Sequence, residues 1–286
     1  MIKRLSLIIL AVLISSVYAN VQYANVQGNN GINDTDVNMI NQYNATRELK
    51  FIIVGDPHVN YSNTSNKAGE KLRSIVNFVN RSDIDFVVFL GDMTNDGTHK
   101  SNNMVKDILK NVTKPYYAVI GNHDIFISPK MFESYYGPME HIENIKGYQL
   151  LFIGIYEDKD KRLHWSFDFD KADKNAPTLV FIHGPVKDLP FGCIQCILEN
   201  EKLLYAKSIG TELDKFTNLI GVYSGHVHYN SNQVINGIRY VTINGLIDMD
   251  IGKYHIRITA IGSSNKVGYS IIKDNKSYYD LVPYKD

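Results

Sequence analysis

The stretch Phe-Val-Val-Phe-Leu-Gly-Asp at residues 86–92 decides the fold, because a short apolar run ends abruptly in glycine and a carboxylate. Such a run is typical of a strand that is buried on both faces. Residues 51–56 (Phe-Ile-Ile-Val-Gly-Asp) show the same pattern, and the apolar run 116–120 ends in Gly-Asn-His-Asp. The segments between them, 68–80 and 104–112, carry apolar residues at helical spacing. Alternating strands and helices predict an α/β protein with a parallel sheet covered by helices.

The second half of the chain predicts a different arrangement. Residues 149–156, 178–182 and 219–223 read as further strands, and 198–216 as a helix. Asn236-Gly237 lies between two apolar runs and predicts a two-residue β-hairpin. The segments 254–261 and 267–272 alternate apolar with polar residues, which favours antiparallel strands. We therefore expect one domain over residues 49–286 with antiparallel strands at its C-terminal end.

The N-terminus has the pattern of an export signal. Lys3 and Arg4 precede the aliphatic run 5–14, and small residues lead up to Ala19. This predicts a signal peptide over residues 1–19 and a secreted or extracytoplasmic protein. The apolar run is short for a membrane span, which needs about 20 residues, but an uncleaved membrane anchor is the alternative. Residues 20–48 are polar and Asn-rich and predict a lead-in segment outside the domain.

The net charge limits the classes of binding partner, and the cysteine spacing predicts the state of the two thiols. The chain has 30 basic and 30 acidic residues, so no broad cationic field attracts nucleic acid or anionic membranes. We predict no specific nucleic-acid or protein partner, and membrane contact only if the N-terminal segment stays attached. Cys193 and Cys196 form a C-x-x-C pair, for which a local disulfide is expected outside the cytoplasm. A redox-active pair is the alternative.

Five predicted strands end beside glycine and a side chain that can bind metal. In chain order these side chains are Asp56, His58, Asp92, Asn122, His183, His226 and His228. Ligands gather outside the carboxyl ends of strands in an open α/β sheet, so these residues can converge. Asp56 and His58 are two residues apart, as are His226 and His228, and an extended chain would point both members of each pair to one side. The glycines leave room for the backbone to approach the cluster closely.

The donor set indicates which metal and which substrate to expect. Carboxylate, imidazole and amide oxygen without thiolate suit Mn, Fe or Zn better than Mg. Seven ligands are too many for one ion with an open position but suffice for two ions that share a carboxylate. Two ions about 3.5–4 Å apart can stabilise the attacking and leaving oxygens of a phosphoryl displacement. We expect two divalent or trivalent ions and a small phosphate-ester substrate.

The five blocks D-x-H, G-D, G-N-H-D, H and G-H-x-H, in this order, resemble the calcineurin-like metallophosphoesterase superfamily. The resemblance implies a four-layer α-β-β-α sandwich with two mixed β-sheets. It also implies two metal sites, which share Asp92 as the bridging ligand. One would use Asp56, His58, Asp92 and His228, and the other Asp92, Asn122, His183 and His226. His123 would face the substrate and protonate the leaving oxygen or stabilise the phosphoryl group.

Asn95 departs from the pattern of two branches of that superfamily. Phosphoprotein phosphatases carry at this place an Asp that supports the catalytic His, and purple acid phosphatases carry a metal-binding Tyr. The chain should therefore not be purple, and Asn95 cannot form a carboxylate–imidazole pair with His123. Asp96 and Asp124 are candidates to support His123 instead. His99, on the same loop, is a candidate phosphate contact, with an exposed loop histidine as the alternative.

These observations favour a hydrolase of phosphate esters. A phosphodiesterase that acts on a nucleotide or lipid headgroup is slightly preferred, because no Arg lies within the motifs to bind a terminal phosphate. A phosphomonoesterase of acid-phosphatase type is the alternative. A metal-holding binding or scaffold protein without turnover is the rival of another class, but its metal ligands would usually be incomplete.

Overall fold

The computed structural model describes residues 49–63, 67–126, 128–157, 159–160, 163–187 and 207–248, and three strands between 257 and 282. The predicted signal peptide, the lead-in segment and both cysteines lie outside these residues. Within the described part of the chain, no helix has the length and apolar character that a membrane crossing requires.

The first sheet joins the predicted parallel strands to the C-terminal antiparallel ones. Its order is β13-β12-β11-β1-β2-β3, with β1, β2 and β3 parallel and the other pairs antiparallel. The strands are β1 (Leu49–Val54), β2 (Phe86–Phe89), β3 (Tyr116–Ala118), β11 (Arg257–Ile261), β12 (Val267–Lys273) and β13 (Lys276–Val282). The C-terminal strands therefore extend the sheet beyond β1.

The second sheet has the order β4-β5-β7-β8-β10-β9, and β6 pairs with β5 outside this path. Strands β5, β7, β8 and β10 are parallel, and the outer pairs β4–β5 and β9–β10 are antiparallel. The strands are β4 (His141–Ile145), β5 (Tyr148–Glu157), β6 (Leu163–Ser166), β7 (Thr178–Ile182), β8 (Leu219–Ser224), β9 (Ser231–Ile235) and β10 (Ile238–Thr242).

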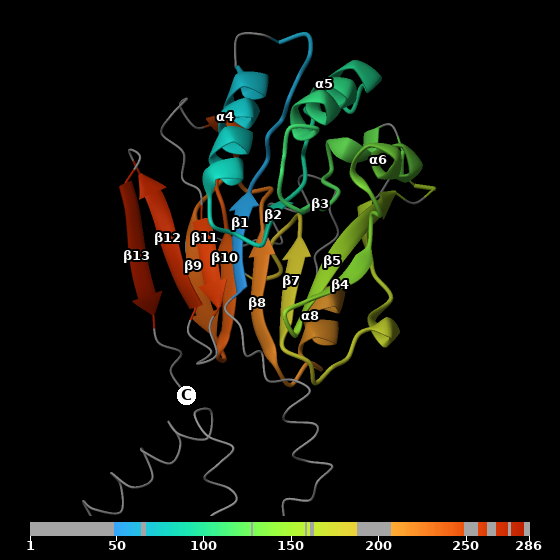
Figure 1. The fold of residues 1–286 in the computed structure, drawn as a ribbon. Helices are drawn as coiled ribbons and strands as arrows, with labels where there is room; N and C mark the ends of the chain where they lie inside the picture. The colour runs from blue at the N-terminus through green and yellow to red at the C-terminus, as the bar shows by residue number, and fades with distance from the viewer. Residues whose placement is uncertain are drawn as a thin grey trace, which may run out of the picture.

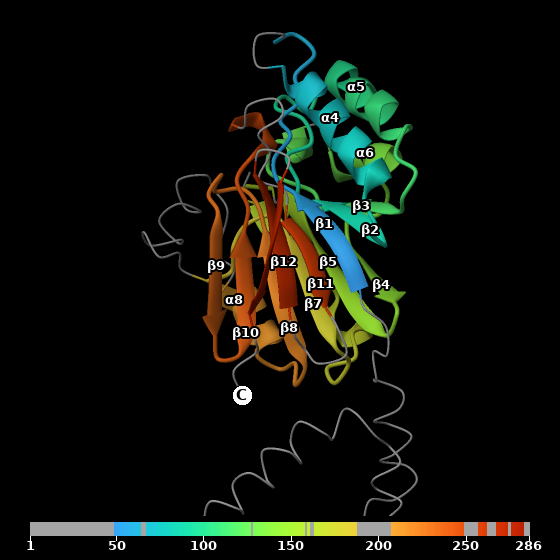
Figure 2. The ribbon, with the colours of Figure 1, turned by 60° about the vertical axis from the view of Figure 1, so that its left-hand side comes forward.

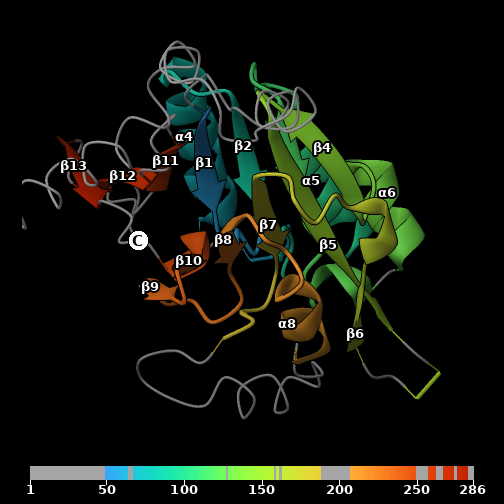
Figure 3. The same cartoon turned by 90° about the horizontal axis from the view of Figure 1, so that it is seen from below.

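Helices cover the outer faces of both sheets. Helices α4 (Ala68–Arg81), α5 (His99–Leu109) and α6 (Pro129–Tyr136) lie on the side of β1, β2 and β3 (Figure 2). Helix α8 (Lys207–Leu213) packs on the far face of the second sheet, with the strands between it and α4 (Figure 3). The 3₁₀ turns are η1 (Asp124–Phe126), η2 (Phe169–Lys171) and η3 (Leu246–Asp248). The four-layer α-β-β-α sandwich is thus confirmed.

The buried strands have apolar residues on both faces because each face meets a different layer. On β1, Phe51 and Ile53 face the second sheet, whereas Ile52 and Val54 pack with the apolar face of α4. The Phe51 ring stacks on Phe86 at a centroid distance of 5.1 Å and meets Phe181 of the second sheet edge-on at 5.6 Å. This two-sided burial explains the continuous apolar runs of the sequence.

Several sequence predictions hold, and others need correction. The Asn236-Gly237 hairpin is present, with Ile235 paired to Ile238. Helix α5 begins at residue 99, not 104, because the Thr98 hydroxyl caps a polar first turn by accepting from the Ser101 N–H. Of the helix predicted over 198–216, the described part is helical only over 207–213. The sequence analysis missed α6, β4, β6 and β13.

Candidate metal centre

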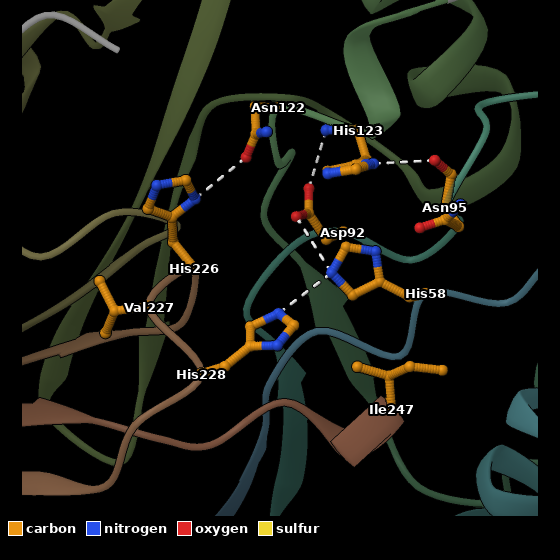
Figure 4. Close-up of a pocket in the computed structure, with 9 residues that line it drawn as sticks. All are labelled: His58, Asp92, Asn95, Asn122, His123, His226, Val227, His228 and Ile247. Carbon is orange, nitrogen blue, oxygen red and sulfur yellow. Dashed lines mark hydrogen bonds and ion pairs between the residues drawn. The ribbon is translucent and has the colours of Figure 1, made fainter. Parts of the chain in front are cut away.

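The predicted strand ends meet at one edge of the sandwich. Strands β1, β2 and β3 belong to the first sheet, and β7 and β8 to the second; the arrowheads of β1, β7 and β8 point to the same edge (Figure 1). A cavity of about 460 Å³ opens there. Its lining residues are His58, Asp92, Asn95, Asn122, His123, His226, Val227, His228 and Ile247 (Figure 4). The cavity is therefore built from both sheets.

One group of donor atoms joins the end of β1 to the end of β8. The Nε2 atoms of His58 and His228 are 3.1 Å apart, and His228 Nε2 lies 3.8 Å from Asp56 Oδ1. His58 Nε2 also lies 3.4 Å from Asp92 Oδ2. Asp56 is fully buried, so its carboxylate faces this cluster and not solvent. The donor atoms of Asp56, His58 and His228 all lie within 4.8 Å of one another, close enough to bind one metal ion.

A second group joins β3, β7 and β8. Asn122 Oδ1 lies 2.9 Å from His183 Nε2 and 3.1 Å from His226 Nδ1. His183 Nε2 is 3.2 Å from His226 Nδ1 and 3.5 Å from Asp92 Oδ2. Asp92 therefore stands between the two groups. The structure brings together all seven side chains that the sequence analysis singled out as metal ligands.

The donor set suits metal ions because lone pairs face one another. His183 Nδ1 donates to the Leu90 carbonyl oxygen at 2.8 Å, which directs Nε2 toward the acceptors Asn122 Oδ1 and Asp92 Oδ2. A backbone carbonyl that fixes the other ring nitrogen is the usual environment of a metal-binding histidine. In addition, His226 Nε2 and His58 Nδ1 are buried without a hydrogen-bond partner in the described structure.

The ionisation states agree with a cation site. Burial lowers the pKa of His58 to about 4, and burial together with His183 lowers the pKa of His226 to about 3, so both rings are neutral at pH 7, as metal ligands must be. Burial alone would lower the pKa of His183, but the Asp92 and Asp56 carboxylates raise it to about 9. In the metal-free protein a proton on His183 Nε2 thus supplies part of the positive charge that the carboxylates require, and metal binding would displace this proton.

The ligand backbone is not extended, which corrects the geometric reasoning applied to the sequence. The φ angles are 42° at Asp56, 45° at His58, 50° at Asp92, 66° at His226 and 48° at His228. Non-glycine residues rarely adopt such positive values. The paired ligands converge because each strand turns sharply at its end. Strain of this kind persists only where surrounding structure enforces it, and it clusters at functional sites.

The glycines at the strand ends are required because carboxylates of the cluster approach them closely, as expected from the sequence. A Cβ on Gly121 would lie 2.1 Å from Asp92 Oδ1, and a Cβ on Gly225 would lie 2.5 Å from Asp56 Oδ2. Any side chain at either position would therefore displace a carboxylate of the cluster. The glycines of the motifs make room for the ligands that follow the neighbouring strands.

His123 is held by the Asp92 carboxylate and by the main chain of Asn95. Its N–H donates to Asp92 Oδ1 at 2.9 Å, and its Nδ1 donates to the Asn95 carbonyl oxygen at 2.8 Å. The ring packs edge-on against His58 at a centroid distance of 4.7 Å, and its other nitrogen points to the cavity side (Figure 4). The support that a carboxylate would give is supplied here by the main chain of Asn95.

Asp96 and Asp124 do not support His123, contrary to expectation. The Asp96 carboxylate accepts from the N–H and hydroxyl of Thr98, at the start of α5. The buried Asp124 carboxylate accepts from the N–H groups of Gly121, Met93 and Thr94, so it ties the loop after β3 to the loop after β2. Burial, with a smaller effect of Asp92, raises the pKa of Asp124 to about 7.

His99 does not line the cavity. Its Nδ1 lies 3.0 Å from the Tyr135 hydroxyl, on the exposed surface between α5 and α6. His99 is therefore an exposed histidine and not a phosphate contact, although it is the first residue of α5 and does not lie in a loop.

Asp248 is a site residue that the sequence analysis missed. Its Oδ2 lies 2.5 Å from His228 Nδ1, so it fixes the ring whose Nε2 enters the donor cluster. Asp248 ends the turn η3, which is anchored by the Ile247 N–H on the Asp56 carbonyl oxygen and by the Lys71 ammonium on the Ile247 carbonyl oxygen. Only the topology points to Asp248: η3 follows β10, and because β10 is parallel to β8, the two strands end at the same edge of the sheet.

Comparison with known proteins identifies the family. A profile described as calcineurin-like phosphoesterase matches residues 49–230. The chain belongs to this family. As a calcineurin-like phosphoesterase, the protein is a metal-dependent phosphoester hydrolase. A relative from Arcobacter nitrofigilis, named as a probable glycerophosphodiester phosphodiesterase GpdQ, is 24% identical over 212 residues, which cover 70% of each chain.

Solved structures with the same fold include proteins of different roles. A dimetal phosphatase from Danio rerio has 15% sequence identity and a TM-score of 0.61, with 83% of this chain and 99% of that chain covered. GAP50, described as the anchor in the inner membrane complex of Plasmodium, has 12% identity and a TM-score of 0.52, with 84% and 90% covered. At these identities the likeness concerns the fold alone.

Replacing Asp248 by Asn should weaken metal binding because the amide is a poorer partner for His228 Nδ1. Loss of such an outer partner typically reduces metal affinity about 10- to 100-fold. Titration of the metal-free protein with Mn²⁺ would measure the change. The exposed acid Asp107 on α5, which pairs with Lys110, provides the control Asp107→Asn. Equal affinity of the Asp248→Asn variant and the wild type would refute the orienting role.

Proposed function

We propose that this calcineurin-like phosphoesterase is a secreted, dinuclear-metal phosphodiesterase. The observation that carries the proposal is the Asp92 carboxylate, whose Oδ2 lies 3.4 Å from His58 Nε2 and 3.5 Å from His183 Nε2. One carboxylate oxygen thus adjoins both donor groups. A shared ligand of this kind is what a pair of cations needs.

Each donor group would hold one cation, with Asp92 common to both. The first site consists of Asp56, His58, Asp92 and His228, and the second of Asp92, Asn122, His183 and His226. Imidazole and carboxylate ligands favour Mn, Fe or Zn. Such cations would neutralise phosphate charge and lower the pKa of the attacking water.

The protein groups around the cations would position the substrate and handle protons. His123 Nδ1 donates to the Asn95 carbonyl oxygen, which can only accept. Nδ1 therefore keeps its proton in both charge states of the ring, and proton exchange falls to Nε2. We assign His123 as the acid that protonates the leaving alcohol oxygen through Nε2.

A diester substrate is favoured over a monoester by the charge of the cavity. None of the lining residues in the described structure is Lys or Arg. A monoester carries about two negative charges near pH 7 and a diester one, so a monoester needs more positive charge than a diester. The name of the Arcobacter relative, a probable glycerophosphodiester phosphodiesterase, points to the same class of substrate. The ester would be of nucleotide or lipid-headgroup type.

The function is tested by a substrate screen on the metal-reconstituted mature chain. Aryl and alkyl diesters should be hydrolysed faster than the matching monoesters and pyrophosphates, with two ions bound per chain by elemental analysis. Faster turnover of monoesters would favour the phosphomonoesterase. Two bound ions without turnover of any ester would favour a scaffold role, comparable to the anchor role ascribed to GAP50.

Replacing Asp92 by Asn should remove both ions and nearly all activity, because both sites lose their common ligand. Elemental analysis and diesterase rates of the purified variant would measure this. Circular dichroism would show whether the variant keeps its fold. An Asp92→Asn protein that retains two ions at wild-type affinity would rule out a shared ligand.

Secretion is proposed from the N-terminal pattern alone. Lys3 and Arg4, the apolar run 5–14 and Ala19 match a cleavable signal peptide. Expression of the full chain in its source cell should yield extracytoplasmic protein whose first residue is Asn20. Intact protein that keeps Met1 and remains with the membrane fraction would instead indicate the anchor.

A further inference from the structure

The cavity offers few protein groups for a substrate once the metal ligands are set aside. Five of its nine lining residues are proposed ligands: His58, Asp92, Asn122, His226 and His228. Two others, Val227 and Ile247, are apolar. The remaining polar lining residues are His123 and Asn95. Apart from the metal ligands, only His123 and Asn95 among the lining side chains can therefore form a hydrogen bond to the substrate.

The main chain of Asn95 is fixed at both of its polar groups. Its N–H donates to the Val59 carbonyl oxygen at 3.1 Å, and its carbonyl oxygen accepts from His123 Nδ1 at 2.8 Å. A bridge between Val59 and Thr94 holds the preceding residue to the loop after β1. The Cα atom of Asn95 is thus fixed before any ligand binds. This reduces the conformational entropy that the residue loses on binding.

The side chain of Asn95 is available for a ligand. Asn95 is exposed, and within the described structure its amide makes no hydrogen bond to another residue. It stands beside His123 and His58 at the rim of the cavity (Figure 4). The amide carries two N–H donors and no charge, so it can bind a phosphate oxygen without preferring a dianion.

We propose that Asn95 has two separate roles: its carbonyl oxygen orients His123, and its side-chain amide binds a non-bridging oxygen of the phosphodiester. This inference rests on the proposed function. The division of roles distinguishes this site from one in which an Asp side chain supports the histidine. Here the histidine depends on the backbone, and the side chain serves substrate binding.

The two roles predict different kinetic effects of side-chain removal. Asn95→Ala keeps the carbonyl oxygen and loses the amide, so KM for bis(p-nitrophenyl) phosphate should rise about tenfold or more, as loss of one hydrogen bond to a charged group implies. The pH profile of kcat should stay unchanged. His123→Ala should instead lower kcat, more for alkyl than for aryl leaving groups. Asn77→Ala, an exposed Asn on α4, is the matched control.

Inorganic phosphate gives a readout that is independent of turnover. Calorimetric titration of the metal-loaded full chain should show about tenfold weaker phosphate binding for Asn95→Ala than for the wild type, and weaker still for Asn95→Asp, whose carboxylate repels the anion. Equal phosphate affinity of wild type and Asn95→Ala would overturn the assignment. A fall in kcat with a shifted pH profile and unchanged KM would overturn it too, because the side chain would then position His123.

The phosphodiesterase activity and the role of Asn95 can be tested independently of each other. A wild type that binds phosphate but cleaves no diester would contradict the phosphodiesterase, while the comparison of phosphate affinities would still decide the role of Asn95.

Discussion

The rest of the site depends on the contacts of the Asp92 carboxylate. Oδ2 adjoins His58 from the first sheet and His183 from the second, and Oδ1 accepts the His123 N–H. One side chain therefore connects the ends of β1, β3 and β7. Burial opposes the ionised form, but His183 and His58 keep the pKa of Asp92 below its usual value. An ionised carboxylate at this depth requires positive charge around it.

The backbone geometry follows from gathering so many donors in a small space. Five ligands have positive φ angles, at a cost on the order of 1–3 kcal/mol each, and the glycines beside them leave no room for a Cβ. The rings of Phe51, Phe86 and Phe181 pack between the sheets and fix the strands whose ends carry the ligands. Packing of the sandwich thus stabilises a strained edge on which the chemistry takes place.

The sequence predicted those features that depend on a short stretch of chain, such as a buried strand and the residues at its end. Apolar runs that end beside glycine and a ligand predicted β1, β2, β3, β7 and β8, and with them the seven converging side chains. That these strands form two sheets came from the family resemblance, because an apolar run does not specify its neighbours. The β4–β5 hairpin was missed since its turn is Lys146-Gly147, with φ angles of 52° and 85°, and not Asn-Gly. The contact of Asp248 with His228 and the use of the Asn95 carbonyl oxygen are long-range or main-chain features, which residue types do not reveal.

The central claim is that the strand ends of both sheets enclose two cations on either side of Asp92. Anomalous diffraction from crystals of the protein loaded with Mn²⁺ tests it most directly. The account predicts two peaks about 3.5–4 Å apart, one beside His58 and His228 and the other beside His183 and His226. A single peak at full metal loading, or peaks away from Asp92, would contradict it.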